Sequence, residues 1–232
     1  MTTRFRADRV GLSSIVAAVI AVLHFGFAAA GAAEPEAKPN RWEKTIQRFE
    51  QRDARQFPPK NAVLFLGSSS IVGWDLKQWF PDVAAINRGF GGSEIADSVR
   101  FAERIVIPYE PRVIVFYAGD NDVAHGKTPE QVLADFRRFT GKVHAALPKT
   151  RIVFVAIKPS IRRWHLVDKM RKANAMIREV CEADERLAFV DIDPPMIGAD
   201  GKPKKELFRD DGLHLNAAGY RLWSEMVRPH LK

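Results

Sequence analysis

The chain of 232 residues contains a single cysteine, no internal repeat and no low-complexity tract, and each absence excludes a class of protein. With Cys181 alone, an intramolecular disulfide is excluded, so the core must stabilise the fold. Cys181 lies in a helical pattern, "NAMIREVCEAD", where a buried structural thiol is the expectation. The hydrophobic content of 46% excludes a disordered chain, and the length suits one globular domain.

Clusters of charge of one sign are also lacking. The formal net charge is +8, but lysine and arginine are dispersed along the chain rather than gathered on one helix or around an aromatic platform. This distribution argues against a nucleic-acid partner. A basic chain is still attracted to anionic surfaces such as acidic glycans or lipid headgroups.

The N-terminus holds the one long apolar run. Three arginines within the first nine residues precede residues 11–33, an uncharged run that ends in small residues. This pattern predicts a secretory signal peptide over residues 1–33, cleaved near Ala32 or Ala33, with an uncleaved membrane anchor as the alternative. Without the leader the net charge falls to +6. We therefore expect a secreted or periplasmic chain with no stable membrane span after cleavage.

Short apolar runs alternate with helical patterns along the rest of the chain. Five runs rich in β-branched residues are too short for helices and nearly continuous, which is typical of strands buried on both faces. They are "AVLFLG", "VAAINRG", "RVIVFYAG", "RIVFVAI" and "LAFVDI". Helical patterns cover residues 41–57, 93–107, 129–146, 165–183 and 216–230.

This alternation predicts a three-layer α/β/α domain of the flavodoxin-like, doubly wound kind, with a parallel sheet of about five strands in the order 2-1-3-4-5. We expect residues 34–60 to form a linker and an N-terminal helix, and residues 61–232 to form the main domain. In such sheets the ligand crevice lies beyond the carboxyl ends of the strands. The segments that follow the strands are therefore the expected place of a functional site.

Those segments carry the groups that acyl transfer requires. They read "GSSS", "GFGGSE", "GDND", "KPSIRRW", "DIDPP" and, after a polar loop, "RDDGLHLN". A serine nucleophile needs a base, and the base needs a carboxylate to orient it. Asp211 and His214 are three residues apart with Gly212 between them, so one turn can place both on the same side. Asp210 is the alternative carboxylate, but its position in a turn points elsewhere, which favours Asp211.

Gly92 and Asn121 are suited to an oxyanion site. Glycine lets a backbone N–H approach the reacting carbonyl closely, and an asparagine amide can donate to the same place. One such donor is typically worth about 3–4 kcal/mol of the barrier. The backbone N–H of the nucleophile would add a third donor. We expect Asp122 to anchor the turn that carries Asn121.

Four stretches, "FLGSSSI", "NRGFGGSE", "YAGDND" and "DDGLHLN", in this order and at these strand ends, resemble the SGNH (GDSL-type) hydrolase family. The resemblance implies the same flavodoxin-like fold, and an esterase, lipase, thioesterase or carbohydrate deacetylase that acts without metal or organic cofactor. Carried over by position, it makes Ser69 the nucleophile and one oxyanion donor, with Gly92 and Asn121 as the other donors. It makes Asp211 the carboxylate and His214 the base.

Ser68 stands where the family usually has an aspartate. Since the catalytic carboxylate comes from the last stretch, this change is expected to alter the local turn or the substrate contacts more than to abolish catalysis. Taken alone, "GSSS" is more typical of a polar turn that caps the following helix, and only the other three stretches favour a nucleophile. We expect Ser70 to be the cap.

Aromatic residues near the strand ends are further candidates for substrate contact. They are Trp74, Phe90 and Trp164, and packing in the core is an equally good interpretation of each. Arg162 and Arg163 share a loop with Trp164 and could receive an anionic group, but a solvated surface role is favoured.

The sequence does not match two other motifs, one for a cofactor and one for catalysis. A dinucleotide loop would need a glycine where Glu94 stands, and the serine-hydrolase elbow G-x-S-x-G would need one at Ile71. Asp191 and Asp193 could be metal ligands, but no further carboxylates cluster near them in the sequence. We expect no metal and no cofactor.

The leading hypothesis is an exported serine esterase that forms an acyl-enzyme with a small-molecule or glycan ester. Short-acyl or acetylated carbohydrate esters are favoured because the chain has no long hydrophobic insertion. An acyltransferase to a glycan hydroxyl is a second hypothesis, although no large insertion provides a lid against water. A catalytically silent module that binds glycans or the cell envelope is a third, motivated by the charge of +6 and by Ser68. The sequence does not indicate an oligomeric state.

Overall fold

The computed structural model describes residues 1–2 and 40–232. The expected signal peptide, apart from its first two residues, and the linker before residue 40 lie outside the described residues. Within the described part of the chain, none of the helices is both long enough and apolar enough to cross a membrane.

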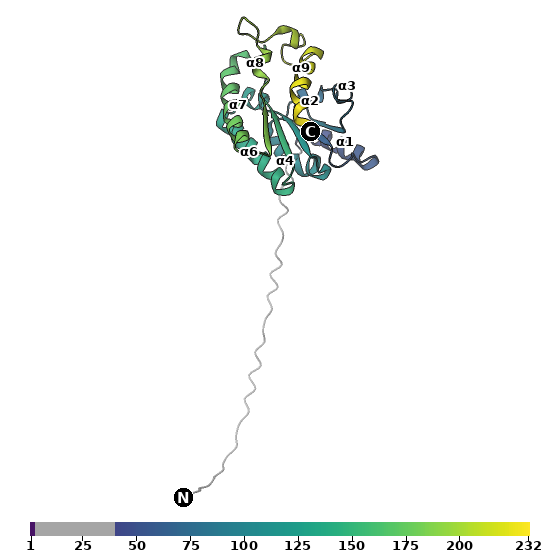
Figure 1. Ribbon diagram of the computed structural model, residues 1–232, viewed down its shortest axis with the longest axis vertical. Helices are drawn as coiled ribbons and strands as arrows, with labels where there is room; N and C mark the ends of the chain where they lie inside the picture. The colour runs from purple at the N-terminus through teal and green to yellow at the C-terminus, as the bar shows by residue number, and fades with distance from the viewer. Residues whose placement is uncertain (3–39) are drawn as a thin grey trace, which may run out of the picture. The chain divides into compact units, whose positions relative to one another are not determined.

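Five parallel strands form one sheet in the order β2-β1-β3-β4-β5 (Figure 1). This confirms the flavodoxin-like α/β/α class and the strand order predicted from the sequence. The order changes direction between β1 and β3, and ligand crevices of open parallel sheets lie at such a switch point. The strands are β1 (Val63–Gly67), β2 (Ala85–Gly89), β3 (Val113–Tyr117), β4 (Arg151–Val155) and β5 (Leu187–Val190).

Successive residues of the central strands alternate between two cores, one on each face of the sheet. On β1, Leu64 and Leu66 belong to one core, and Val63 and Phe65 belong to the other. The pleat of a strand produces this alternation, and helices cover both faces. The strands are therefore nearly continuous apolar runs in the sequence.

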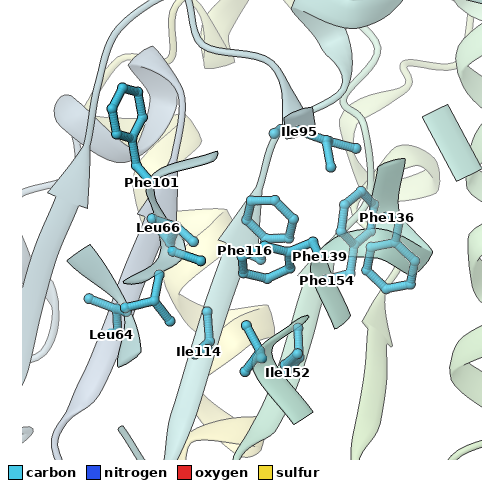
Figure 2. Packing of buried hydrophobic residues seen from close by; sticks show 14 of the residues in the cluster. Leu64, Leu66, Ile95, Phe101, Ile114, Phe116, Phe136, Phe139, Ile152 and Phe154 are labelled. Atoms are coloured by element: carbon cyan, nitrogen blue, oxygen red, sulfur yellow. The ribbon is translucent and has the colours of Figure 1, made fainter. Parts of the chain in front are cut away.

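Four helices pack onto the first face and its core. Figure 2 shows part of this core, where Phe116 and Phe154 of the sheet meet Phe136 and Phe139 of α6, with the rings of Phe116 and Phe139 centred 4.3 Å apart. Trp42, at the start of the first helix, also belongs to this core, so the N-terminal helix is part of the same compact unit. The helices are α1 (Glu43–Arg55), α4 (Ile95–Ile105), α6 (Pro129–Ala146) and α7 (Val167–Glu182).

The second face is covered mainly by α9 (Ala217–Val227). Shorter helices complete this layer and the loops: α2 (Ser69–Val72), α3 (Leu76–Trp79), α5 (Asp120–Ala124), α8 (Asp193–Met196), and the 3-10 helices η1 (Ile107–Tyr109), η2 (Trp164–Leu166), η3 (Lys205–Leu207) and η4 (Arg228–Leu231).

The helices agree with the sequence patterns, and the differences lie at their ends. α6 spans the expected residues, and a capping box of Thr128 and Gln131 fixes its start. The C-terminal pattern begins as α9 after the Asn216 cap but continues from residue 228 as a 3-10 helix. Pro229 explains the change, because proline removes a backbone donor from the helix.

Candidate active site

Ser69 begins α2, the short helix that directly follows β1. The turn between them is tight: Gly67 has a φ of +136°, and a Cβ there would lie 1.8 Å from the carbonyl oxygen of Tyr117. Glycine is therefore required at this position. The turn brings Ser69 to the carboxyl edge of the sheet, partly exposed, with its backbone N–H at the start of a helix, where it needs no helical partner.

His214 connects Ser69 to Asp211. Its Nε2 lies 3.1 Å from Ser69 Oγ, and its Nδ1 lies 2.6 Å from Asp211 Oδ2. Since an ionised carboxylate can only accept, Nδ1 carries the proton, and Nε2 is free to accept the proton of the Ser69 hydroxyl. The structure thus brings together the three residues that the sequence singled out, and Asp211 rather than Asp210 contacts the imidazole.

Asp211 is held in an ionised state by its own loop. The side-chain hydrogen bond to His214, together with backbone N–H groups of His214 and Leu213 that donate to Asp211 Oδ1 at 2.9 Å, keeps its pKa well below the usual range. An ionised carboxylate at this place orients the imidazole and stabilises the imidazolium that forms when Ser69 loses its proton.

Gly92 lies in the loop after β2 with a φ of +76°, a region that favours glycine. The loop passes beside the nucleophile, because a Cβ on the preceding Gly91 would lie 3.9 Å from Ser69 Cβ. Arg41 Nη2 donates to the Gly92 carbonyl oxygen at 2.7 Å and so holds the loop from outside. This placement agrees with an oxyanion role for the loop.

Asn121 is the second residue of α5, in the loop after β3. Its Nδ2 donates to the carbonyl oxygen of Ser93 at 2.9 Å, which ties it to the loop that carries Gly92. Its Oδ1 accepts a hydrogen bond from Arg163 Nη2 at 2.9 Å. The loops after β1, β2 and β3 therefore meet at one edge of the sheet, and the oxyanion roles of Gly92 and Asn121 stay predictions.

Asp122 anchors this arrangement, as the sequence predicted. Both of its carboxylate oxygens lie 3.2 Å from the backbone nitrogen of Ile95, the first residue of α4, and Oδ1 accepts from Lys127 Nζ at 2.9 Å. Burial raises the pKa of Asp122 to about 6, against the opposing effect of Lys127. The bonds connect the start of α5 to the start of α4.

A buried group of charges behind Asn121 was not foreseen from the sequence. Lys158 is 1% exposed, and its Nζ lies 3.1 Å from Asp120 Oδ2 and 2.9 Å from the Tyr117 hydroxyl. Arg163 Nη1 lies 3.0 Å from the same oxygen of Asp120. "KPSIRRW" did stand out as a segment after a strand, but its spacing does not tell which of its cations turns inward.

The two arginines of that segment have different environments. Arg162 is exposed, as favoured from the sequence. The expectation of a solvated role is wrong for Arg163, whose side chain is 16% exposed and lies against Asp120 and Asn121. Adjacent residues of a loop point in different directions, and here one faces the core.

Ser68 and Ser70 do not have the expected roles. Ser68 is fully buried, so the prediction that it contacts substrate is wrong; it occupies the N-cap position of α2, with no side-chain capping bond. Ser70 is not the cap either, because it lies within the helix and its hydroxyl accepts from Lys158 at 3.3 Å. Of the three serines, only Ser69 is partly exposed.

Trp74 and Phe90 are core residues, and the prediction that they contact substrate is wrong. Each is 1% exposed. The indole Nε1 of Trp74 donates to Ser224 Oγ at 2.9 Å, and Phe90 packs edge to face on Trp42. An aromatic residue beside a strand end can be drawn under the covering helices, which is the packing interpretation that the sequence left open.

Trp164 has a different environment, because it is partly exposed and lines a surface pocket of about 620 Å³. Lys202 Nζ lies 5.1 Å from the centre of its ring. Ile161 lines the same pocket and also borders the depression beside Asp211 and Gly212. A substrate contact by Trp164 stays a prediction.

Asp191 and Asp193 pair with arginines, Asp191 with Arg178 and Asp193 with Arg171. Among the residues that the structure describes, no group of three or more His, Cys, Asp or Glu side chains is arranged to hold a metal ion.

A parallel α/β/α sheet whose carboxyl edge carries hydrogen-bonded serine, histidine and aspartate side chains has the architecture of a serine hydrolase. The sequence model of the GDSL-like Lipase/Acylhydrolase family matches residues 65–222. The chain therefore belongs to this family and is an ester-bond hydrolase.

Comparisons with individual proteins agree with this assignment. The chain is 28% identical over 189 residues to the alpha1 subunit of platelet-activating factor acetylhydrolase IB from Homo sapiens, with 78% of each chain covered. A GDSL-like lipase from Bacteroides thetaiotaomicron has a similar structure, with a TM-score of 0.70, 20% identity, and coverage of 80% of this chain and 96% of that one. An acetylxylan esterase from Geobacillus stearothermophilus shares the fold at a TM-score of 0.58 and 15% identity, with 73% and 94% covered.

Proposed function

We propose that the chain is an exported serine esterase that removes short acyl groups, above all acetyl, from carbohydrate esters. The observation that carries this proposal is the continuous hydrogen-bonded path from Ser69 Oγ through His214 to Asp211. A serine hydroxyl is a weak nucleophile, and a path of this kind is what activates it. Ser69 is therefore assigned as the nucleophile, His214 as the base and Asp211 as the orienting carboxylate.

The reaction proceeds through an acyl-enzyme. Ser69 Oγ attacks the ester carbonyl while His214 Nε2 takes its proton. The backbone N–H groups of Ser69 and Gly92 and the amide of Asn121 donate to the oxyanion. The C–O bond then breaks, and His214 returns the proton to the leaving alcohol. Water, deprotonated by His214, attacks the acyl-enzyme, which releases the acid and restores the Ser69 hydroxyl.

The scarcity of exposed apolar surface supports a short acyl group. Among the described residues, the large hydrophobic side chains that are exposed are Met1, Phe57, Val72 and Ile161. Only Val72, in α2, and Ile161, beside the Asp211 loop, lie on segments of the site. Two such side chains do not make an extended surface for a long chain. Acetyl is also the group in the names of the human and Geobacillus relatives.

The pocket beside Trp164 supports a carbohydrate as the alcohol part. It combines one partly exposed aromatic ring with polar side chains, among them Asp200, Lys202 and Glu206. Binding sites of small molecules commonly pair an apolar surface with a few polar groups that fix orientation. A sugar ring presents both an apolar face and hydroxyl groups to such a pocket.

The open triad favours hydrolysis over transfer to a second sugar. The side chains of His214 and Asp211 are 32% and 36% exposed, so water has access to the base. The hydrogen bond between His214 and Ser69 likewise favours an enzyme over a silent binding module, because binding alone does not require an activated serine.

A panel of substrates tests this proposal. Acetyl, butyryl and octanoyl p-nitrophenyl esters and acetylated xylan are given to the wild type and to Ser69→Ala, with Ser70→Ala as the neighbouring-serine control. We expect acetate release by the wild type from both simple ester and glycan, a fall in rate with acyl length, and only background rates for Ser69→Ala. Equal hydrolysis by wild type and Ser69→Ala would overturn the proposal. Free acid as a minor product in the presence of a glycan acceptor would favour transfer.

Export is tested separately from chemistry. The full chain is expressed in a Gram-negative host, and the periplasmic fraction is analysed by intact mass. We expect a mature chain that begins near Ala33 or Glu34. A full-length chain retained with the membrane fraction would instead support the uncleaved anchor.

A further inference from the structure

Arg163 contacts the side chain of Asn121, the candidate oxyanion donor, at its amide oxygen. Its Nη2 donates to Asn121 Oδ1 at 2.9 Å, and its Nη1 lies 3.0 Å from Asp120 Oδ2. The two contacts occupy both terminal nitrogens of the guanidinium and leave the side chain only 16% exposed. Such a buried arginine is poorly placed to receive an anionic substrate from solvent.

The chemistry of the partners fixes the orientation of the Asn121 amide. Arginine has only donors, and the Ser93 carbonyl has only an acceptor. The amide oxygen must therefore face Arg163, and the amide nitrogen must face Ser93, as the structure shows. With the amide reversed, a donor would meet a donor and an acceptor would meet an acceptor. Within residues 40–232, Nδ2 makes this one bond, so its second N–H is available.

Arg163 is itself fixed by buried charge. Burial alone would raise the pKa of Asp120, but Lys158 and Arg163 beside it lower the pKa, so the carboxylate is ionised. The Asp120–Arg163 pair is a close ion pair without an aligned hydrogen bond at Nη1, and Lys158 Nζ contacts the same carboxylate oxygen at 3.1 Å. The ion pair with Asp120 therefore holds the Arg163 guanidinium against Asn121.

The backbone around Arg163 is also tied to the catalytic loop. Arg162 N donates to the Gly212 carbonyl oxygen at 3.0 Å, between Asp211 and His214. The segment after β4 thus contacts both the loop of the base and the residue of the oxyanion site.

We infer that Arg163 is a positioning residue, which holds the Asn121 amide with one N–H aimed at the oxyanion and polarises that amide with its charge. This inference rests on the proposed function. Because the oxyanion forms only during the reaction, loss of Arg163 lowers kcat and leaves KM nearly unchanged. A merely structural role would instead lower stability without a selective effect on kcat.

A double-mutant cycle tests the inference. Hydrolysis of p-nitrophenyl acetate is measured for the wild type, Arg163→Met, Asn121→Ala and the double variant, with exposed Arg221→Met on α9 as the matched control. Loss of one oxyanion donor costs about 10²–10³ in kcat. We expect Arg163→Met to lower kcat on the order of 10- to 100-fold, and to lower it less than about threefold further when Asn121 is already alanine.

Two further variants keep the outcomes distinct. Arg163→Lys keeps the charge but cannot bridge both partners, so we expect an intermediate kcat; thermal unfolding of every variant shows whether it is folded. The inference would be overturned if Arg163→Met lowered kcat by the same factor in the wild type and in Asn121→Ala. A wild-type kcat in folded Arg163→Met would also overturn it. Ser69→Ala in the same assay reports on the proposed function: if it remains active, that function fails, whatever the result at Arg163.

Discussion

At the scale of single residues, the proposed function depends on one hydrogen-bonded path for a proton. Ser69, at the start of α2, and Asp211, in the loop before α9, are 142 positions apart in the chain. His214 nevertheless lies within hydrogen-bond distance of both, at 3.1 and 2.6 Å. Asp211 matters for its charge and its position, since it fixes which imidazole nitrogen carries the proton. Two predictions separate these effects.

Asp211→Asn is expected to lower kcat by about 10³–10⁴-fold while the protein stays folded. The amide can still occupy the turn, but its NH₂ group favours the wrong imidazole tautomer. Steady-state hydrolysis of p-nitrophenyl acetate measures the loss. The matched control is Asp210→Asn, which is expected to be within twofold of the wild type. A similar loss from both variants would contradict the assignment of Asp211.

The pH dependence of activity follows from the lowered pKa of Asp211. A carboxyl group whose pKa is lowered by folding stabilises the native loop above its unfolded pKa and loses that contribution as pH falls through the folded value. Asp211 therefore stays ionised between about pH 4 and pH 8. We expect log kcat/KM to rise with pH with a slope of one on the acid side, reporting a single proton. A slope of two above about pH 4 would show that Asp211 also titrates there.

At the scale of elements, strand ends place the site. β1, β2 and β3 deliver Ser69, Gly92 and Asn121 to one edge, and this convergence was predictable because parallel strands end together. Which side chains of each loop point into the protein and which point to solvent was not predictable. Burial of Trp74 and Phe90 and the inward turn of Arg163 depend on which helix covers each residue, and single-sequence spacing carries no such information.

Gly67→Ala tests the tight turn between β1 and α2. A Cβ would lie 1.8 Å from the Tyr117 carbonyl oxygen, at a φ of +136°, so strand β1 or β3 must shift. We expect a loss of stability of at least about 2 kcal/mol, with loss of activity in whatever remains folded. Gly126→Ala is the control, because it also has a positive φ but no atom within 4 Å of its Cβ. If both variants lowered the free energy of unfolding in urea by the same small amount, the close approach at Gly67 would be contradicted.

Ile46→Ala tests how much α1 contributes to the stability of the domain. Ile46 is fully buried in the core on the α1 face of the sheet. Removal of its side chain is expected to lower the free energy of unfolding by about 2–5 kcal/mol, measured by urea denaturation. A loss below about 0.5 kcal/mol would mean that α1 contributes little to the fold.

At the scale of the whole molecule, the sequence predicted the sheet order and singled out Ser69, His214 and Asp211, the three side chains that hydrogen bonds join in the structure. Both depend on chain-wide regularities: the alternation of strands and helices, and four motifs in a fixed order. The buried group of Lys158, Asp120 and Arg163 escaped prediction because charged residues after a strand are ordinarily solvated. Only the packed loops show that both cations pair with the Asp120 carboxylate.

Cys181 is buried in the core on the α1 face of the sheet, so its thiol is expected to react slowly. Burial raises the pKa of its thiol to about 12. A disulfide-exchange reagent at pH 8 is therefore expected to react with the native protein only slowly and to titrate one thiol in denaturant. Stoichiometric reaction of the native chain within seconds would show that this part of α7 opens readily.

Every step of the proposed reaction depends on Ser69, the middle serine of the triplet, as the nucleophile. Its most direct test is covalent labelling with a fluorophosphonate, followed by peptide mapping of the modified residue. We expect one label per chain, located on Ser69, and none on Ser69→Ala. A label on Ser68 or Ser70, or no label on the folded wild type, would contradict it.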